Sequence, residues 1–306
     1  MAVVLPHLSN RAEAMARRLV DAKAGGLASE IERLPSEIME VPAADRYQAL
    51  ALALGRLVLM AEGYRNRSAL PDPVAAELSR AIGWAVTRDD LLANPSALRK
   101  SSTWHPLASL SRRDAPTLRR DEQWMVCEQT GAAAVLVDYR PVRGKGKPKK
   151  AGGSAAPLAH SPFEGELVFY PSAAPIEALL GEGAHASDHS VLWSDPDTAP
   201  LPTRWSEALD TAIEILTAVP WRRAAPVLLG SATLLPSRGC LLIADASGEA
   251  VPLAPHAAEL SRAGLLSIAG EAPFWLAALW DGTAAHPLAA GCQGAMWRGK
   301  GGKAIL

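Results

Sequence analysis

The sequence predicts an α+β protein, with an N-terminal helical region followed by an antiparallel β-sheet and a few intervening helices. Apolar residues recur at three- and four-residue spacing through the first hundred residues, as on one face of a helix. From Thr117 onward they fall in short alternating runs bounded by turn residues, as in strands. Helices first and strands afterwards are typical of the α+β class. We expect a helical region over residues 1–105 and an antiparallel α+β region over residues 106–306.

The helical region divides at its capping and breaking residues. Asn10 is a candidate N-cap with Glu13 at the capping-box position, and Gly25-Gly26 supplies a stop signal. A second helix is expected over residues 43–64, where leucines and a valine line one face. Prolines at 71 and 73 separate it from a third helix, so the region resembles a small bundle.

The first strands follow at the change of period. Residues 118–128 and 132–139 read as a hairpin across a short turn, and residues 163–170 as a third strand. Between them, residues 140–162 are rich in Gly, Pro, Lys and Ala, which indicates a basic, flexible insertion.

The last third reads as strands with two preceding helices. We expect a short helix over residues 176–180 and a longer one over residues 204–218. The expected strands are residues 227–235, 240–245, 250–253, 265–269 and 275–281. Explicit turns between several of them favour antiparallel neighbours. The glycine- and lysine-rich tail, residues 298–303, is expected to be disordered.

Composition excludes several classes of protein. The 306 residues are 49% hydrophobic, and no apolar run approaches the ~20 residues of a membrane span. The N-terminus shows no signal-peptide pattern, so we expect a cytoplasmic protein. Cys127, Cys240 and Cys292 stand far apart, which favours neither a disulfide framework nor a zinc ribbon. We expect buried, unreactive thiols.

Charge is distributed unevenly along the chain. Residues 99–150 carry twelve Lys/Arg against five Asp/Glu, whereas residues 151–220 carry one arginine against ten acidic residues. Two segments that compensate each other in the fold are the favoured interpretation, and a nucleic-acid or partner surface is the alternative. The candidate contact residues for that surface are Arg112, Arg113, Arg119, Arg120, Arg140, Arg143, Lys145, Lys147, Lys149 and Lys150.

No motif predicts a reaction. His185 and His189 have a zinc-binding spacing only on a helix, and their glycine- and serine-rich surroundings argue against one. Ser231 lacks the final glycine of a nucleophile elbow, and the Gly-x-Gly-Lys string near Lys145 is not a Walker loop. We therefore expect no catalytic residue, cofactor or metal, with a hydrolase or a metal enzyme built on the two histidines as an alternative.

Several strings along the chain resemble a known family, the C-terminal region of bacterial SWIM zinc-finger proteins. They are residues 16–27 (ARRLVDAKAGGL), 82–87 (IGWAVT), 122–124 (EQW), 166–171 (ELVFYP) with Pro175, 219–221 (VPW) and 274–281 (FWLAALWD). Each is a packing motif, and none is catalytic. The resemblance covers nearly the whole chain.

The resemblance implies a function without chemistry. Members of the family carry an N-terminal zinc site of the form C-x-C…C-x-H, and no such spacing exists here. Relatives resemble components encoded near MoxR-type AAA+ ATPases and von Willebrand A-domain proteins. The resemblance therefore implies a non-enzymatic binding or scaffold subunit, whose partner is a separately encoded SWIM zinc-finger protein or a MoxR/von Willebrand A-domain complex.

Overall fold

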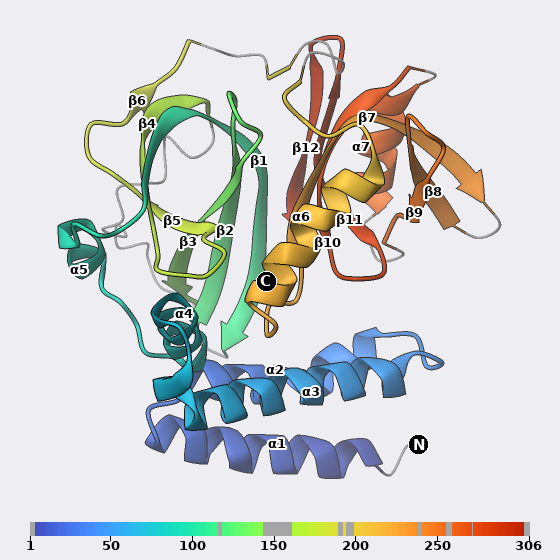
Figure 1. Ribbon diagram of the computed structural model, residues 1–306. Coiled ribbons are helices and arrows are strands. Elements are labelled where there is room, and N and C mark those ends of the chain that lie inside the picture. The colour runs from blue at the N-terminus through green and yellow to red at the C-terminus, as the bar shows by residue number, and fades with distance from the viewer. Residues whose placement is uncertain are drawn as a thin grey trace.

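The fold is α+β, with a helical N-terminal part followed by a β-rich part (Figure 1). The computed structural model describes residues 4–115, 118–142, 161–188, 192–193, 199–237, 240–254, 259–270 and 272–302. The helices are α1 (Val4–Asp21), α2 (Gly25–Glu40), α3 (Arg46–Arg65), α4 (Asp72–Ile82), α5 (Arg88–Ala93), α6 (Trp205–Ala218) and α7 (Glu259–Ala269), with a 3-10 turn, η1, at Arg67–Ala69.

The strands alternate with turns over the rest of the chain. They are β1 (Arg99–Ala115), β2 (Leu118–Cys127), β3 (Ala133–Pro141), β4 (Phe163–Phe169), β5 (Glu177–Leu180), β6 (His185–Ala186), β7 (Ala225–Ser237), β8 (Cys240–Asp245), β9 (Ala250–Pro252), β10 (Phe274–Trp280), β11 (Ala285–Cys292) and β12 (Ala295–Gly302). Among the described helices, none combines the length and the apolar character that a membrane span needs.

Helices α1–α4 form a layer beneath the strands, and α2 packs against each of the other three (Figure 1). The first predicted helix does stop before Gly25-Gly26, because α1 ends at Asp21, but the sequence did not predict α2, which begins at Gly25 and continues through Pro35. The helical region is also shorter than expected, because β1 already begins at Arg99 rather than after residue 105.

Gly26 is what allows α2 and α4 to approach so closely. A Cβ atom at residue 26 would clash with the backbone carbonyl of Ala81, near the end of α4. Gly83, at φ +123°, turns the chain away directly after α4 and lies against the backbone of Gly25 and Gly26. The pair of glycines therefore acts in helix packing, which is a role that the stop-signal interpretation missed.

Substitution of Gly26 by alanine is expected to lower the free energy of unfolding by about 1–3 kcal/mol, because two backbones must separate. Gly25→Ala is the matched control, since a Cβ there meets nothing within 4 Å. Urea denaturation of both variants measures the difference. Equal stability of the two variants would show that a Cβ atom fits between α2 and α4, which would contradict the packing role of Gly26.

Strands β1–β5 close into a barrel. β1 pairs antiparallel with both β2 and β4, β2 with β3, and β4 with β5, while β3 and β5 pair in parallel. This strand order is the one found in OB-fold barrels. The barrel interior holds a core that includes Trp104, Met125, Phe163 and Leu167, all fully buried.

The short strand β6 pairs with β4 of the barrel, and strands β7–β12 form a second sheet in the order β12-β11-β10-β7-β8-β9. The long strand β1 joins it to the barrel through a parallel pairing with β12. The expected antiparallel sheet therefore contains two parallel pairs, β1–β12 and β3–β5. The pairing with β1 includes Gly299, Lys300 and Gly302 of β12. The tail that the sequence predicted to be disordered is therefore a strand as far as Gly302.

Both faces of the second sheet are buried, and β10 shows why its sequence is apolar throughout. Phe274 and Leu276 face the core beneath α6 and α7, whereas Trp275 and Leu279 face the outside of the barrel. Side chains alternate between the faces of a strand, so a strand that is covered on both sides needs a continuous apolar run. Trp275 and Trp280, five residues apart, likewise lie on opposite faces.

Two short elements were predicted with the wrong type. The segment predicted as a helix over residues 176–180 instead forms the strand β5 (Glu177–Leu180), because the closure of the barrel provides pairing partners for it. Residues 265–269 belong to the helix α7 instead of a strand, since this segment packs over β11 and β12. Short apolar runs do not distinguish the two types. Most of the predicted insertion, residues 143–160, lies outside the described part of the chain.

Candidate functional site

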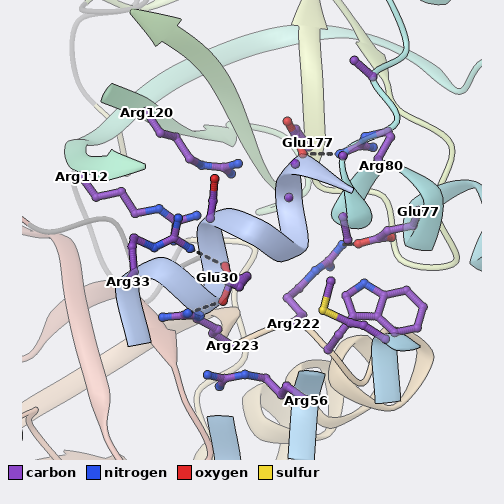
Figure 2. Close-up of a pocket in the computed structure, with 18 of the residues that line it drawn as sticks. Glu30, Arg33, Arg56, Glu77, Arg80, Arg112, Arg120, Glu177, Arg222 and Arg223 are labelled. Atoms are coloured by element: carbon purple, nitrogen blue, oxygen red, sulfur yellow. Dashed lines mark hydrogen bonds and ion pairs between the residues drawn. The ribbon is translucent and has the colours of Figure 1, made fainter. Parts of the chain in front are cut away.

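A cavity of about 720 Å³ lies where the helical layer meets the barrel and the loop after α6 (residues 219–224). Among the described residues, its charged lining comprises seven arginines and three glutamates, all labelled in Figure 2. Aromatic side chains, including Tyr139, Tyr170 and Trp221, complete the walls together with apolar groups. Cavities of this size are large enough for small organic molecules.

The loop after α6 places two arginines against the helical layer. Arg222 donates to Glu77 on α4 at 2.6 Å and to the carbonyl oxygen of Ala174 at 3.0 Å. Arg223 is paired with Glu30 on α2 and lies 2.8 Å from Glu37, which is two helical turns further along α2. These five side chains are largely buried, so the two arginines tie the helical layer to the β-rich part by desolvated ion pairs.

Glu30 is the most strongly perturbed acid in the cavity. Burial raises its pKa, but Arg223 and Arg33 outweigh the burial, with a smaller effect of Arg112, and lower the pKa of Glu30 to about 2. The same arginines lower the pKa of Glu37 despite its burial. Both carboxylates are therefore charged at neutral pH, and each neutralises part of the surrounding positive charge.

The barrel contributes Arg112 and Arg120 to the cavity. They are direct neighbours across the β1–β2 pair and point to the same face. Arg120 donates to the buried Glu122 at 2.7 Å and to the hydroxyl of Tyr139 at 2.8 Å. Glu122 also accepts a hydrogen bond from the indole of Trp124 at 3.2 Å. Burial lowers the pKa of Arg120, but the opposite effect of Glu177, Tyr139 and Glu122 is larger. The pKa of Arg120 is therefore raised overall, and the side chain stays charged.

A further ion pair lies between α4 and β5, at the edge of the cavity. Arg80 is paired with Glu177, and its guanidinium group lies 4.2 Å from the centroid of the Tyr170 ring. This stacking is a cation–π contact. The pair fixes α4 against the barrel at the edge of the cavity (Figure 2).

Arg56 on α3 differs from the other arginines of the cavity. Within the described part of the chain it has no acidic side chain at ion-pair distance and no hydrogen-bond partner. Burial and the neighbouring Arg223 lower the pKa of Arg56, although Glu30 and Glu37 partly offset them. Arg56 therefore adds positive charge to a place that already holds Arg223.

The structure divides the predicted basic surface. Arg112 and Arg120 enter the cavity, whereas Arg113 and Arg119 pair on the opposite face of the same hairpin and are exposed. Arg119 and Arg140 both interact with Asp121 there. The other predicted contacts, Arg143, Lys145, Lys147, Lys149 and Lys150, lie outside the described residues.

The oppositely charged segments of the sequence meet at one described ion pair. Arg99 on β1 lies 2.7 Å from Glu166 on β4, across a pair of neighbouring strands. The described arginines further along β1–β3 are paired mainly within their own segment. Within the described residues, the basic and acidic segments therefore neutralise each other's charge by an ion pair at this one place only.

The two histidines of the alternative metal site are not seen together. His185 is exposed in β6 and lies 3.7 Å from Glu164, whereas His189 lies outside the described residues. Within the described ranges, no group of three or more His, Cys, Asp or Glu side chains is arranged to hold a metal ion. Cys127 and Cys292 are buried and Cys240 is half-buried, all three with free thiols.

A second feature is an apolar stripe along the outer side of α3. We call Tyr47, Ala51, Leu54, Val58 and Ala61 the α3 stripe. Their spacing of four, three, four and three residues places them in one line along the helix. All five are exposed, with Tyr47 at 72%, Leu54 at 46% and Val58 at 59%.

Exposed apolar groups are concentrated on this helix. Of the fifteen large apolar side chains that are exposed among the described residues, six belong to α3. Scattered exposed apolar residues are ordinary, whereas exposed apolar residues gathered in one contiguous patch are typical of interaction surfaces. The apolar face that the sequence predicted on this helix included Leu54 and Val58, but the structure leaves both exposed and buries Ala53 and Met60 instead.

Comparison with known proteins supports the resemblance over the helical region. Residues 2–82 match the family model described as a SWIM-associated four-helix bundle domain. The helical layer is similar to that domain. The match ends where α4 ends, at Ile82, so α1–α4 account for the four helices. Neither the curated proteins nor the solved structures contain a significant match to the chain.

Proposed function

We propose that this protein is a non-enzymatic binding subunit that receives an α-helix of a protein partner along the α3 stripe. The similarity of residues 2–82 to a SWIM-associated domain supports a partner that carries a SWIM zinc finger. A SWIM zinc-finger protein encoded in the same genome is the first candidate. A complex of a MoxR-type ATPase with a von Willebrand A-domain protein is the second candidate.

The exposed α3 stripe carries this proposal. A 4-3-4-3 apolar spacing is the pattern by which helices pack side by side, with knobs of one helix in holes of the next. On α3 the opposite side, at Ala53 and Met60, already packs into the layer, so the exposed line is a second packing surface. An amphipathic helix is the partner that such a surface fits.

A nucleic-acid interface is the alternative that we favour less. OB-fold barrels bind oligonucleotides on the outer face of their second and third strands. Here the same face of β2 and β3 is covered, because Trp124 and Val135 pack against the second sheet and Arg120 faces the cavity. Similarity of fold alone does not transfer a function.

The test replaces an apolar residue of the stripe by a charged one. Val58→Glu is expected to weaken binding to the SWIM zinc-finger protein by at least about tenfold, because a central interface residue contributes more than ~1.4 kcal/mol. The fold should be unaffected, since Val58 is 59% exposed. Affinity is measured by calorimetry on the co-purified pair.

The matched control is Leu266→Glu, a substitution of an equally exposed leucine on α7, which lies far from α3 in Figure 1. It should bind like the wild type. Equal weakening by both substitutions, or full affinity of Val58→Glu, would contradict the proposal. Self-association of the wild-type chain that Val58→Glu abolishes would instead assign the α3 stripe to a second copy and overturn the partner.

A further inference from the structure

We propose that the cavity at the junction of the helical layer and the barrel binds a small organic acid, whose carboxylate group is held by Arg56 and by the indole N–H of Trp221. The apolar body of the acid would fill the rest of the space. The α3 stripe takes no part, because Arg56 lines the cavity together with Ala53 and Met60, on the other side of α3.

Two hydrogen-bond donors of the cavity lack partners. Arg56 makes neither an ion pair nor a hydrogen bond within the described part of the chain. The indole nitrogen of Trp221 is buried and likewise has no hydrogen-bond partner among the described residues. A buried donor without an acceptor costs free energy, so such groups are nearly always paired. A ligand that supplies acceptor oxygens would satisfy both donors.

The fold brings these two donors into neighbouring parts of the cavity. Trp221 packs against the buried cluster that contains Met60. Met60 lies one helical turn after Arg56 on α3, and all three residues line the cavity. Figure 2 shows the Arg56 side chain next to Arg223, on the side of the cavity formed by α3. Arg56 is half-buried, so a ligand can reach it from solvent.

The surroundings of Arg56 favour a ligand with a negative charge. Burial and the nearby Arg223 lower the pKa of Arg56, which means that they disfavour its positive charge. The nearest acids, Glu30 and Glu37, offset this only in part, and both are already bonded to Arg223 and Arg33. A bound carboxylate would compensate Arg56 directly, since the two N–H groups of a guanidinium fork match the two oxygens of one carboxylate.

The other walls of the cavity suit an apolar body. Further charged pairs of the described lining neutralise each other, namely Arg80 with Glu177, Arg222 with Glu77, and Arg120 with the buried Glu122 behind it. Leu34, Val135 and Ile176 are buried and line the space between these pairs. Ligand sites typically combine apolar walls with a few well-placed polar groups. An acid with an aromatic or branched apolar body therefore fits the cavity better than a highly polar one.

The experiment titrates the purified full-length chain with acetate, hexanoate and phenylacetate at constant ionic strength. The readout is the indole N–H resonance of Trp221 in NMR spectra, which is assigned by its absence in Trp221→Phe. Phenylacetate and hexanoate should shift this resonance saturably and bind more tightly than acetate, because they bury more apolar surface. Phenylacetamide, the uncharged counterpart of phenylacetate, should bind at least about tenfold more weakly than phenylacetate.

Two substitutions test the two donors separately, with affinity measured by calorimetry. Arg56→Met should be at least as stable as the wild type, because Arg56 has no described partner, yet bind phenylacetate at least about tenfold more weakly. Trp221→Phe keeps an aromatic ring without the donor and should weaken binding about fivefold. Arg65→Met is the matched control at the end of the same helix, where the arginine is 74% exposed, and should bind like the wild type.

Several results would overturn the proposal. They are the absence of a saturable shift with all three acids, equal binding of phenylacetate and phenylacetamide, and equal affinity of Arg56→Met and the wild type. A loss of stability in Arg56→Met that accounts for its weaker binding would also overturn it and assign Arg56 to the fold. Tighter binding of inorganic phosphate than of phenylacetate would do the same and assign the cavity to another class of anion.

Discussion

Replacement of Arg223 by methionine is expected to lower the free energy of unfolding by about 3–5 kcal/mol, the largest effect that we predict for a single substitution. The change removes the cation that lies between Glu30 and Glu37, both of which are mostly buried. Two carboxylates would then remain in a desolvated place with only part of their compensation. Urea denaturation, followed by circular dichroism, measures the loss.

Two comparisons isolate this cause. Arg65→Met removes an exposed pair with Glu62 and should cost less than about 1 kcal/mol. Adding Glu30→Gln and Glu37→Gln to Arg223→Met should restore much of the lost stability, because the uncompensated charges are gone. If Arg65→Met cost as much as Arg223→Met, or if the triple variant were no more stable than the single one, the ion pairs would not explain the effect.

The second large effect is a loss of stability in acid. The pKa of Glu30 is about 2 in the folded protein, compared with 4.5 for a glutamate in the unfolded chain. A group whose folded pKa is depressed stabilises the protein above its unfolded pKa, and this stabilisation is lost as the pH falls toward the folded value. Glu30 should therefore contribute on the order of 3 kcal/mol near neutrality, and lose it between pH 4.5 and pH 2.

Other acids of the same region modify the effect. Glu37 has a lowered pKa and acts in the same direction. Burial raises the pKa of Glu77 beyond what Arg222 offsets, so protonation of Glu77 favours the folded state and acts in the opposite direction. The measurement is the free energy of unfolding of the wild type and of Glu30→Gln between pH 6 and pH 3. The difference in the free energy of unfolding between the wild type and Glu30→Gln should become smaller as the pH falls. A difference that stays constant would contradict the role of Glu30.

Local sequence patterns were sufficient for the class of the fold and for most long elements. The helices over residues 43–64 and 204–218 and the hairpin over residues 118–139 follow from periodicity and turn residues, and the structure confirms them. The helix α2 was missed because Gly25-Gly26 resembles a stop signal, and only the approach of α4 reveals its packing role. The closure of the barrel depends on pairings between distant strands, which no local pattern encodes.

The candidate cavity was predicted only in part. The doublets Arg112-Arg113 and Arg119-Arg120 were recognised as basic, but the register of the hairpin decides which member of each enters the cavity. Glu30, Arg56 and Arg223 gave no signal, because charged residues on a helix or in a loop usually indicate a solvated surface. Arg223 meets Glu30 only because the loop after α6 reaches the helical layer.

A photo-crosslink from residue 58 tests the central claim, that the α3 stripe receives a helix of a SWIM zinc-finger partner. A photoreactive phenylalanine analogue replaces Val58 in one sample and Leu266 in another, and both are irradiated with the partner. We predict an efficient crosslink from residue 58 to the apolar face of one helix of the partner, and none from residue 266. Equal crosslinking from both positions, or none from residue 58 while the complex stays intact, would contradict this account.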